Sequence, residues 1–107
     1  MEIVTIRDVH LLDGSVYIDK LGRSDVEYLY NDLVDEMYLL GWSIDVWDYD
    51  YMDRLDIELE RNTNADITNS SMMRDKFVYD LVHCINDILD KKRSEERRVG
   101  KECRSRW

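Results

Sequence analysis

The sequence has 107 residues, no proline, 36% charged residues and a formal net charge of −9. A hydrophobic content of 44% with seven tyrosines at this length indicates one folded domain and excludes a disordered acidic chain, which would be poor in aromatic residues. No apolar stretch approaches the roughly 20 residues of a membrane span, and the first residues lack a secretory-signal pattern, so we expect a soluble cytoplasmic protein.

A first hairpin is predicted in residues 9–19, "VHLLDGSVYID". Asp13-Gly14 favours a two-residue type I′ turn, and apolar residues flank it on both sides. That turn sets the pairing across the hairpin. On one face, Leu11 pairs with Val16 and Val9 with Ile18; on the other face, His10 pairs with Tyr17 and Asp8 with Asp19.

A first helix is predicted in residues 24–41, "SDVEYLYNDLVDEMYLLG". Ser24 and Glu27 have the spacing of a capping box at its start, and Gly41 stands where a glycine commonly ends a helix. Apolar residues at helical spacing mark the side expected to be buried. They are Val26, Leu29, Tyr30, Leu33, Val34, Met37 and Leu40.

A second hairpin and a second helix follow. Leu55, Ile57 and Leu59 alternate with charged residues, which is typical of a half-buried strand, and Trp42, Ile44 and Val46 alternate in the same way before them. A polar loop is expected at 62–71, followed by a helix from about Ser71 through Lys92, with serine caps at its start. Its predicted buried face is Met73, Phe77, Leu81, Cys84, Ile85 and Ile88.

The predicted order is therefore ββα followed by ββα. Hairpins alternating with helices favour an α+β domain, in which two helices pack on one face of a mostly antiparallel sheet. The other face of such a sheet is left open to solvent or to a partner.

The last fifteen residues, 93–107 ("RSEERRVGKECRSRW"), are basic, unlike the rest of the chain. They resemble, without a mismatch, one translated frame of a widely used short-read sequencing adapter. The resemblance implies a gene from assembled metagenomic DNA, a non-native basic tail derived from adapter at 93–107, and a single acidic α+β domain at 1–92. The helix formers that follow Lys91 are also compatible with an extension of the last helix.

Without the tail, the remaining domain has a more negative net charge than the whole chain. Residues 93–107 hold six of the fifteen basic residues and three of the 24 acidic ones, which leaves nine against 21 in residues 1–92, a net charge of −12. Solubility of a small domain needs a net charge of only about 2–8 in magnitude. The excess acidity is the main indication of function.

Acidic residues are concentrated in the second hairpin, where only Arg54 opposes them. Alternate residues of a strand are roughly 6.7 Å apart, so the carboxylates of the later strand form a row, which Asp45 extends if the outward faces coincide. We expect this region to bind a partner, and we expect acidic residues of the first helix to contribute to the binding. The predicted binding residues are Asp45, Trp47, Asp48, Tyr49, Asp50, Tyr51, Asp53, Asp56, Glu58 and Glu60, with Asp32, Asp35 and Glu36. A plain solvated sheet face with aromatic cross-strand pairs is the structural alternative.

A calcium loop is a poor match to residues 48–53, "DYDYMD". The EF-hand pattern needs a third oxygen ligand at its fifth position and a glycine at its sixth, and here these places hold Met52 and Asp53. No metal site and no cofactor are therefore predicted. A divalent-cation-responsive binding module stays open as a weaker alternative.

Catalytic patterns are missing from the sequence. It has no glycine-rich phosphate loop, no metalloprotease motif and no Cys-x-x-Cys pair. Cys84 and His83 fall within an apolar helical pattern, and His10 has no nucleophile suggested beside it. We therefore do not expect an enzyme.

In size and acidity, residues 1–92 resemble the small phage-encoded anti-CRISPR proteins that act as DNA mimics. The resemblance implies an inhibitor that works in the host cytoplasm by occupying a basic nucleic-acid-binding surface, such as that of a CRISPR effector. It implies protein–protein interaction, with no direct binding to nucleic acid and none to membrane. The alternative is a homo-oligomeric interaction module, antitoxin-like or an assembly protein, in which an open sheet face or a helix makes a homodimer.

Overall fold

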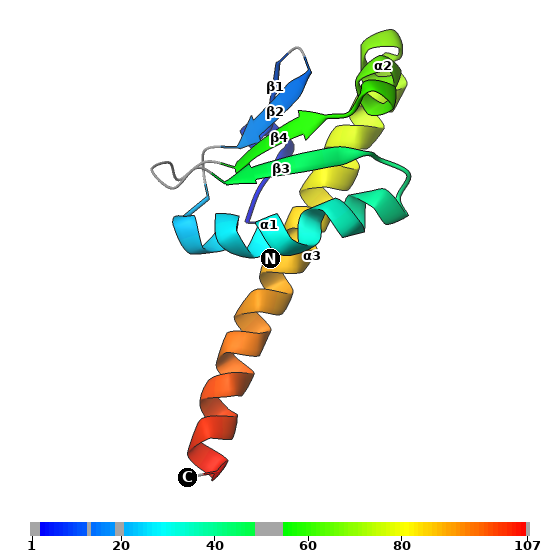
Figure 1. Cartoon of the computed structure of the whole chain (residues 1–107). Coiled ribbons are helices and arrows are strands. Elements are labelled where there is room, and N and C mark those ends of the chain that lie inside the picture. Colours follow the sequence, from blue (N-terminus) through cyan, green and yellow to red (C-terminus); the bar gives the residue numbers. More distant parts are fainter. Residues whose placement is uncertain (1–2, 13, 19–20, 49–54, 107) are drawn as a thin grey trace.

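A computed structural model describes residues 3–12, 14–18, 21–48 and 55–106 of the chain (Figure 1). The described residues mix helices with a four-stranded antiparallel sheet, which confirms the predicted α+β class. In chain order the elements are η1 (Ile6–Asp8), β1 (His10–Leu12), β2 (Ser15–Ile18), α1 (Arg23–Leu39), β3 (Ile44–Asp48), β4 (Leu55–Leu59), α2 (Arg61–Asn69) and α3 (Ser71–Arg106).

Both predicted hairpins form, and they join into one sheet of order β1-β2-β4-β3. In the first, Leu11 pairs with Val16 and His10 with Tyr17, as the Asp13-Gly14 turn predicts. Gly14 has a φ of +76°, the left-handed region that glycine adopts at little cost. The predicted pairing of Val9 with Ile18 is not part of the ladder, because Val9 instead caps the 3₁₀ turn η1.

One hydrophobic core lies between the sheet and the two long helices. Val16, Ile57 and Val46 stand directly opposite one another across β2, β4 and β3, and all three are buried. Residues of α1 and α3 belong to the same buried cluster, including Leu33 and Leu81. Both helices therefore cover one face of the sheet, as predicted and as Figure 1 shows.

The two ends of α1 are built differently. The helix begins after Gly22, which provides no side-chain cap, so the predicted capping box at Ser24 is wrong; Ser24 instead accepts a hydrogen bond from Lys92 Nζ at 3.2 Å. At the other end, the prediction for Gly41 is confirmed. Gly41 has a φ of +93° and donates to the Tyr38 carbonyl, while the next N–H, of Trp42, donates to the Met37 carbonyl.

The buried side of α1 is narrower than the sequence predicts. Val26, Leu29, Leu33 and Met37 are buried, whereas Tyr30 is 51% exposed, and Leu40 is exposed and Val34 only partly buried. The reason is that α1 packs on the sheet along one line of residues, which leaves the flanks of the helix at the surface.

A short helix, α2, replaces most of the polar loop expected at 62–71, so the simple ββα-ββα order is not what the structure shows. Thr63 and Ile67, one turn apart, are its buried residues. Thr63 Oγ1 accepts a hydrogen bond from the N–H of Ser43 at 2.9 Å, which ties α2 to the start of β3. A buried face of one threonine and one isoleucine is too weak a pattern to predict a helix.

The last helix, α3, is longer than the predicted segment ending near Lys92. Ser70 caps its start, as predicted, by accepting a hydrogen bond from the N–H of Met73 at 3.3 Å. The helix then runs for 36 residues, about 54 Å at 1.5 Å per residue, through Gly100. Figure 1 shows its C-terminal part projecting away from the rest of the molecule.

Candidate protein-binding face

The face of the sheet turned away from α1 and α3 carries three of the predicted acidic residues of the strands, Asp45, Asp56 and Glu58. Because the helix-facing positions of β3 and β4 are Ile44, Val46, Leu55, Ile57 and Leu59, the residues between them belong to the other side. The ladder places these in two rows across the sheet: His10, Tyr17, Asp56 and Trp47 in one, and Leu12, Ser15, Glu58 and Asp45 in the next. We call these two rows the outer face.

Three carboxylates of the outer face are immediate neighbours. Asp45 is directly opposite Glu58, and Asp56 is two residues from Glu58 on the same strand. Asp45 and Glu58 are exposed, and Asp56 is partly buried. The three carboxylates therefore stand together on one side of the sheet.

Aromatic rings border the carboxylates on the β1 side. The rings of His10 and Tyr17 are stacked, with centroids 4.7 Å apart and planes inclined by 15°. Tyr17 is directly opposite Asp56, so an aromatic side chain and a carboxylate adjoin at the middle of the outer face. Tyrosines of this kind contribute strongly to protein interfaces because they bury a large area with few rotatable bonds.

The remaining predicted binding residues do not all join this surface. Glu60 follows β4 as the exposed N-cap of α2, and Asp48 is opposite Leu55, at a position of the helix-facing set rather than of the outer face. The helix residues are on α1, in the other layer of the molecule: Asp32, Asp35 and Glu36. The predictions for Tyr49, Asp50, Tyr51 and Asp53 fall outside the described residues.

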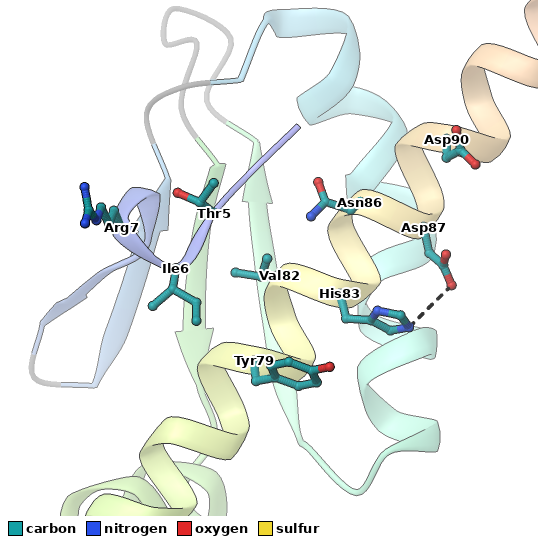
Figure 2. Close-up of a pocket in the computed structure, with 9 residues that line it drawn as sticks. All are labelled: Thr5, Ile6, Arg7, Tyr79, Val82, His83, Asn86, Asp87 and Asp90. Atoms are coloured by element: carbon teal, nitrogen blue, oxygen red, sulfur yellow. Dashed lines mark ion pairs between the residues drawn. The ribbon is translucent and has the colours of Figure 1, made fainter. Parts of the chain in front are cut away.

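A groove that the sequence does not predict lies between η1 and α3 (Figure 2). Its volume is about 680 Å³, and Ile6, Tyr79 and Val82 give it an apolar lining. The acidic and basic groups that also line it include His83 and Asp87, whose Nε2 and Oδ2 atoms are 3.9 Å apart. Tyr79, Val82 and His83 fall on the flank of the predicted buried face of α3, a position that sequence periodicity treats as a boundary.

The side chain of Asn86, in the same groove, has a structural role. Its Oδ1 accepts hydrogen bonds from the N–H groups of Ile3 and Val4, both at 2.8 Å, and its Nδ2 donates to the Val4 carbonyl at 2.9 Å. This side chain holds the N-terminal segment against α3, so it is not available to a ligand.

Two features of the described residues bear on metal binding and on thiol chemistry. Within them, no group of three or more His, Cys, Asp or Glu side chains is arranged to hold a metal ion. Burial, with smaller effects from Glu36, Asp80 and Asp87, raises the pKa of the Cys84 thiol from 9.0 to about 11. The thiol therefore stays protonated at neutral pH, and a protonated, buried thiol is a poor nucleophile.

Comparisons with protein-family models, with curated proteins and with solved structures found no match to this chain. In the described part of the chain, no helix has an apolar stretch of the length required to cross a membrane.

Proposed function

We propose that the protein is a non-enzymatic acidic inhibitor whose outer face occupies the basic nucleic-acid-binding surface of another protein, in the manner of an anti-CRISPR DNA mimic. The observation that supports this most is the adjacency of Asp45, Glu58 and Asp56 on the sheet face opposite the helices. The net charge of −12 on residues 1–92 gives that face a strongly negative background.

Surfaces that bind nucleic acid are adapted to a dense line of negative charge. Duplex DNA carries one charge per roughly 1.7 Å of its axis, and proteins meet it with grooves of lysine and arginine. A sheet places carboxylates about 5 Å apart across strands and about 7 Å apart along them, so a small patch presents several at once. Such a patch would compete with phosphates for the same basic side chains.

The proposal predicts a characteristic dependence on salt. Attraction between oppositely charged surfaces accelerates association and is screened by ions, with a Debye length of about 10 Å at 0.1 M salt and about 3 Å at 1 M. Affinity for the partner should therefore fall steeply as salt is added. The protein itself, being negative, should show no affinity for DNA.

The test is a competition assay with the full chain and a panel of basic nucleic-acid enzymes that includes CRISPR effectors. Labelled DNA or guide RNA is bound to each enzyme, and its release on addition of the protein is followed by fluorescence anisotropy. We expect displacement from at least one enzyme, weakened about tenfold or more between about 0.1 and 0.5 M NaCl. Absence of displacement across the panel, or displacement insensitive to salt, would count against the proposal.

A further inference from the structure

Strand β3 is at one end of the sheet, and the alternate peptide groups along its far side point away from β4. The Ser43 carbonyl accepts a hydrogen bond from the N–H of Glu60 at 3.1 Å, so the peptide groups of Ser43 are turned towards β4. Along an antiparallel strand, the N–H and C=O groups of successive residues point alternately to one neighbouring strand and to the opposite side. The N–H and C=O groups of Ile44, Val46 and Asp48 therefore point out of the sheet edge.

Helix α1 lies directly under this edge. Among the strands, β3 is the one against which α1 packs most closely. The flank of α1 that faces α3 is fixed by the ion pair between Asp25 and Lys92, at 3.0 Å. The opposite flank, beside the β3 edge, carries a row of residues one turn apart: Tyr30, Val34 and Tyr38.

Two large aromatic side chains of this flank reach the surface. Tyr30 is 51% exposed and Tyr38 is 71% exposed, and Val34 between them is partly buried. An apolar row that continues the line of a sheet edge combines backbone hydrogen-bonding groups with side chains able to bury area. These are the two components from which strand-addition interfaces are made.

We propose that a second copy of this chain binds here, with the β3 edges pairing antiparallel and the α1 flanks packing against each other about a two-fold axis. A two-fold axis through Val46 pairs Val46 with its own counterpart and Ile44 with Asp48 of the second copy. All three residues present their peptide groups to the edge, so each such pair can exchange two backbone hydrogen bonds. Two-fold association of this kind requires only that one surface complement itself.

The register also explains why a second copy suits this edge despite the charge of the protein. About an axis at Val46, Asp45 stands opposite Trp47 of the second copy, so the two Asp45 carboxylates are not placed opposite each other. The strand itself, Ile44–Asp48, contains neither lysine nor proline, which commonly block edge pairing. This inference is independent of the proposed function, although the dimer would join two outer faces into one continuous sheet surface.

The two proposals differ in the direction of their salt dependence. Two copies that each carry a net charge of −9 repel one another, so screening should strengthen a dimer held by backbone pairing and tyrosine packing. Sedimentation equilibrium of the full chain in about 0.1 M and about 1 M NaCl measures this. We expect the dimer fraction to rise with salt, whereas binding of a basic partner should fall.

Two variants test the geometry. Tyr38→Lys puts a charge on the α1 flank, and Asp48→Pro removes an N–H that points out of the edge without removing a hydrogen bond to β4. Each should weaken dimerisation about tenfold or more, because each removes a contact made twice about the axis. Tyr79→Lys is the matched control, since Tyr79 is 64% exposed but lies on α3. Circular dichroism checks that each variant is folded.

A wild-type chain that stays monomeric at both salt concentrations would overturn the proposal. Self-association that weakens with salt would also overturn it, because that result indicates attraction between the basic residues 93–107 and the acidic body. If Tyr79→Lys disrupted the dimer as much as Tyr38→Lys did, the interface would be elsewhere. Should Asp48→Pro fail to fold, the comparison of the two tyrosine variants still decides the question.

Discussion

Replacing Phe77 with alanine is expected to lower the free energy of unfolding by about 3–5 kcal/mol. Phe77 is fully buried on α3, and its ring meets that of Trp42 edge to face, with centroids 5.2 Å apart. Its removal loses the burial of an aromatic ring and leaves a cavity between α3 and the start of β3. Urea denaturation followed by tryptophan fluorescence measures the change.

The expected loss is a large fraction of the free energy of unfolding of a domain of this size. Folded domains are stable by about 5–15 kcal/mol, so the variant should unfold at a much lower urea concentration. Tyr79→Ala is the control, because Tyr79 is two residues further along the same helix but 64% exposed. Its effect should stay within about 0.5 kcal/mol. Equal losses in the two variants would show that the described packing of α3 is wrong.

Replacing Asn86 with alanine is expected to cost about 2–4 kcal/mol, because two N–H groups and one carbonyl of the N-terminal segment lose their partner together. Val4, whose N–H and C=O are both held by Asn86, is fully buried. The amide of Val4 should also show the largest increase in hydrogen-exchange rate. Urea denaturation gives the first quantity, and exchange measured by NMR gives the second.

Asn31→Ala provides the same substitution at a site without that role. Asn31 is exposed on α1, and its Nδ2 donates one hydrogen bond of 3.3 Å to the Glu27 carbonyl. Its replacement should change stability by no more than about 0.5 kcal/mol. If Asn86→Ala changed stability as little, and the Val4 amide stayed protected, the N-terminal segment would be held by something other than Asn86.

Local chemistry explains which parts of the fold could be predicted. The Asp13-Gly14 turn determines the pairing of Leu11 with Val16, because a two-residue turn leaves one register. Gly41 ends α1 because glycine adopts a φ of +93° at little cost, whereas a residue with a side chain would be strained there. In both cases a few neighbouring residues determine the backbone, without help from distant parts of the chain.

The predictions that fail depend on contacts between distant residues. Ser24 has the spacing of a cap, but Lys92, 68 residues later, reaches its hydroxyl, and the helix starts earlier. The helix α2 is stabilised by burial of Ile67 and by the bond from Ser43 to Thr63. Neither contact can be recognised until the rest of the fold is in place.

The candidate site was predicted in part, for the same reason. Alternation within β4 is enough to place Asp56 and Glu58 on one side of the strand, and the register of the second hairpin adds Asp45. That Tyr17 adjoins Asp56 depends on the pairing of β2 with β4, which no turn determines. The separation of Asp35 and the other α1 carboxylates from the outer face likewise follows from the layering of the domain.

The measurement that tests the account most directly compares two variants with the same change of charge. The first neutralises the outer face with Asp45→Asn, Asp56→Asn and Glu58→Gln. The second neutralises α1 with Asp32→Asn, Asp35→Asn and Glu36→Gln. Both lose three negative charges, so general attraction to a basic enzyme falls equally in the two, and only the position of the charges differs.

Affinity for an enzyme that wild-type protein displaces from its DNA or guide RNA is measured for both, together with their unfolding free energies. We predict that the outer-face variant loses about 1,000-fold or more in affinity, because close charge pairs at interfaces each contribute on the order of 1.5 kcal/mol or more and three charges are removed. The α1 variant should lose less than about fivefold. The unfolding free energies show whether a loss of affinity in either variant comes from a loss of folding. Equal losses of affinity in the two variants, or a larger loss in the α1 variant, would contradict the assignment of the outer face as the binding surface.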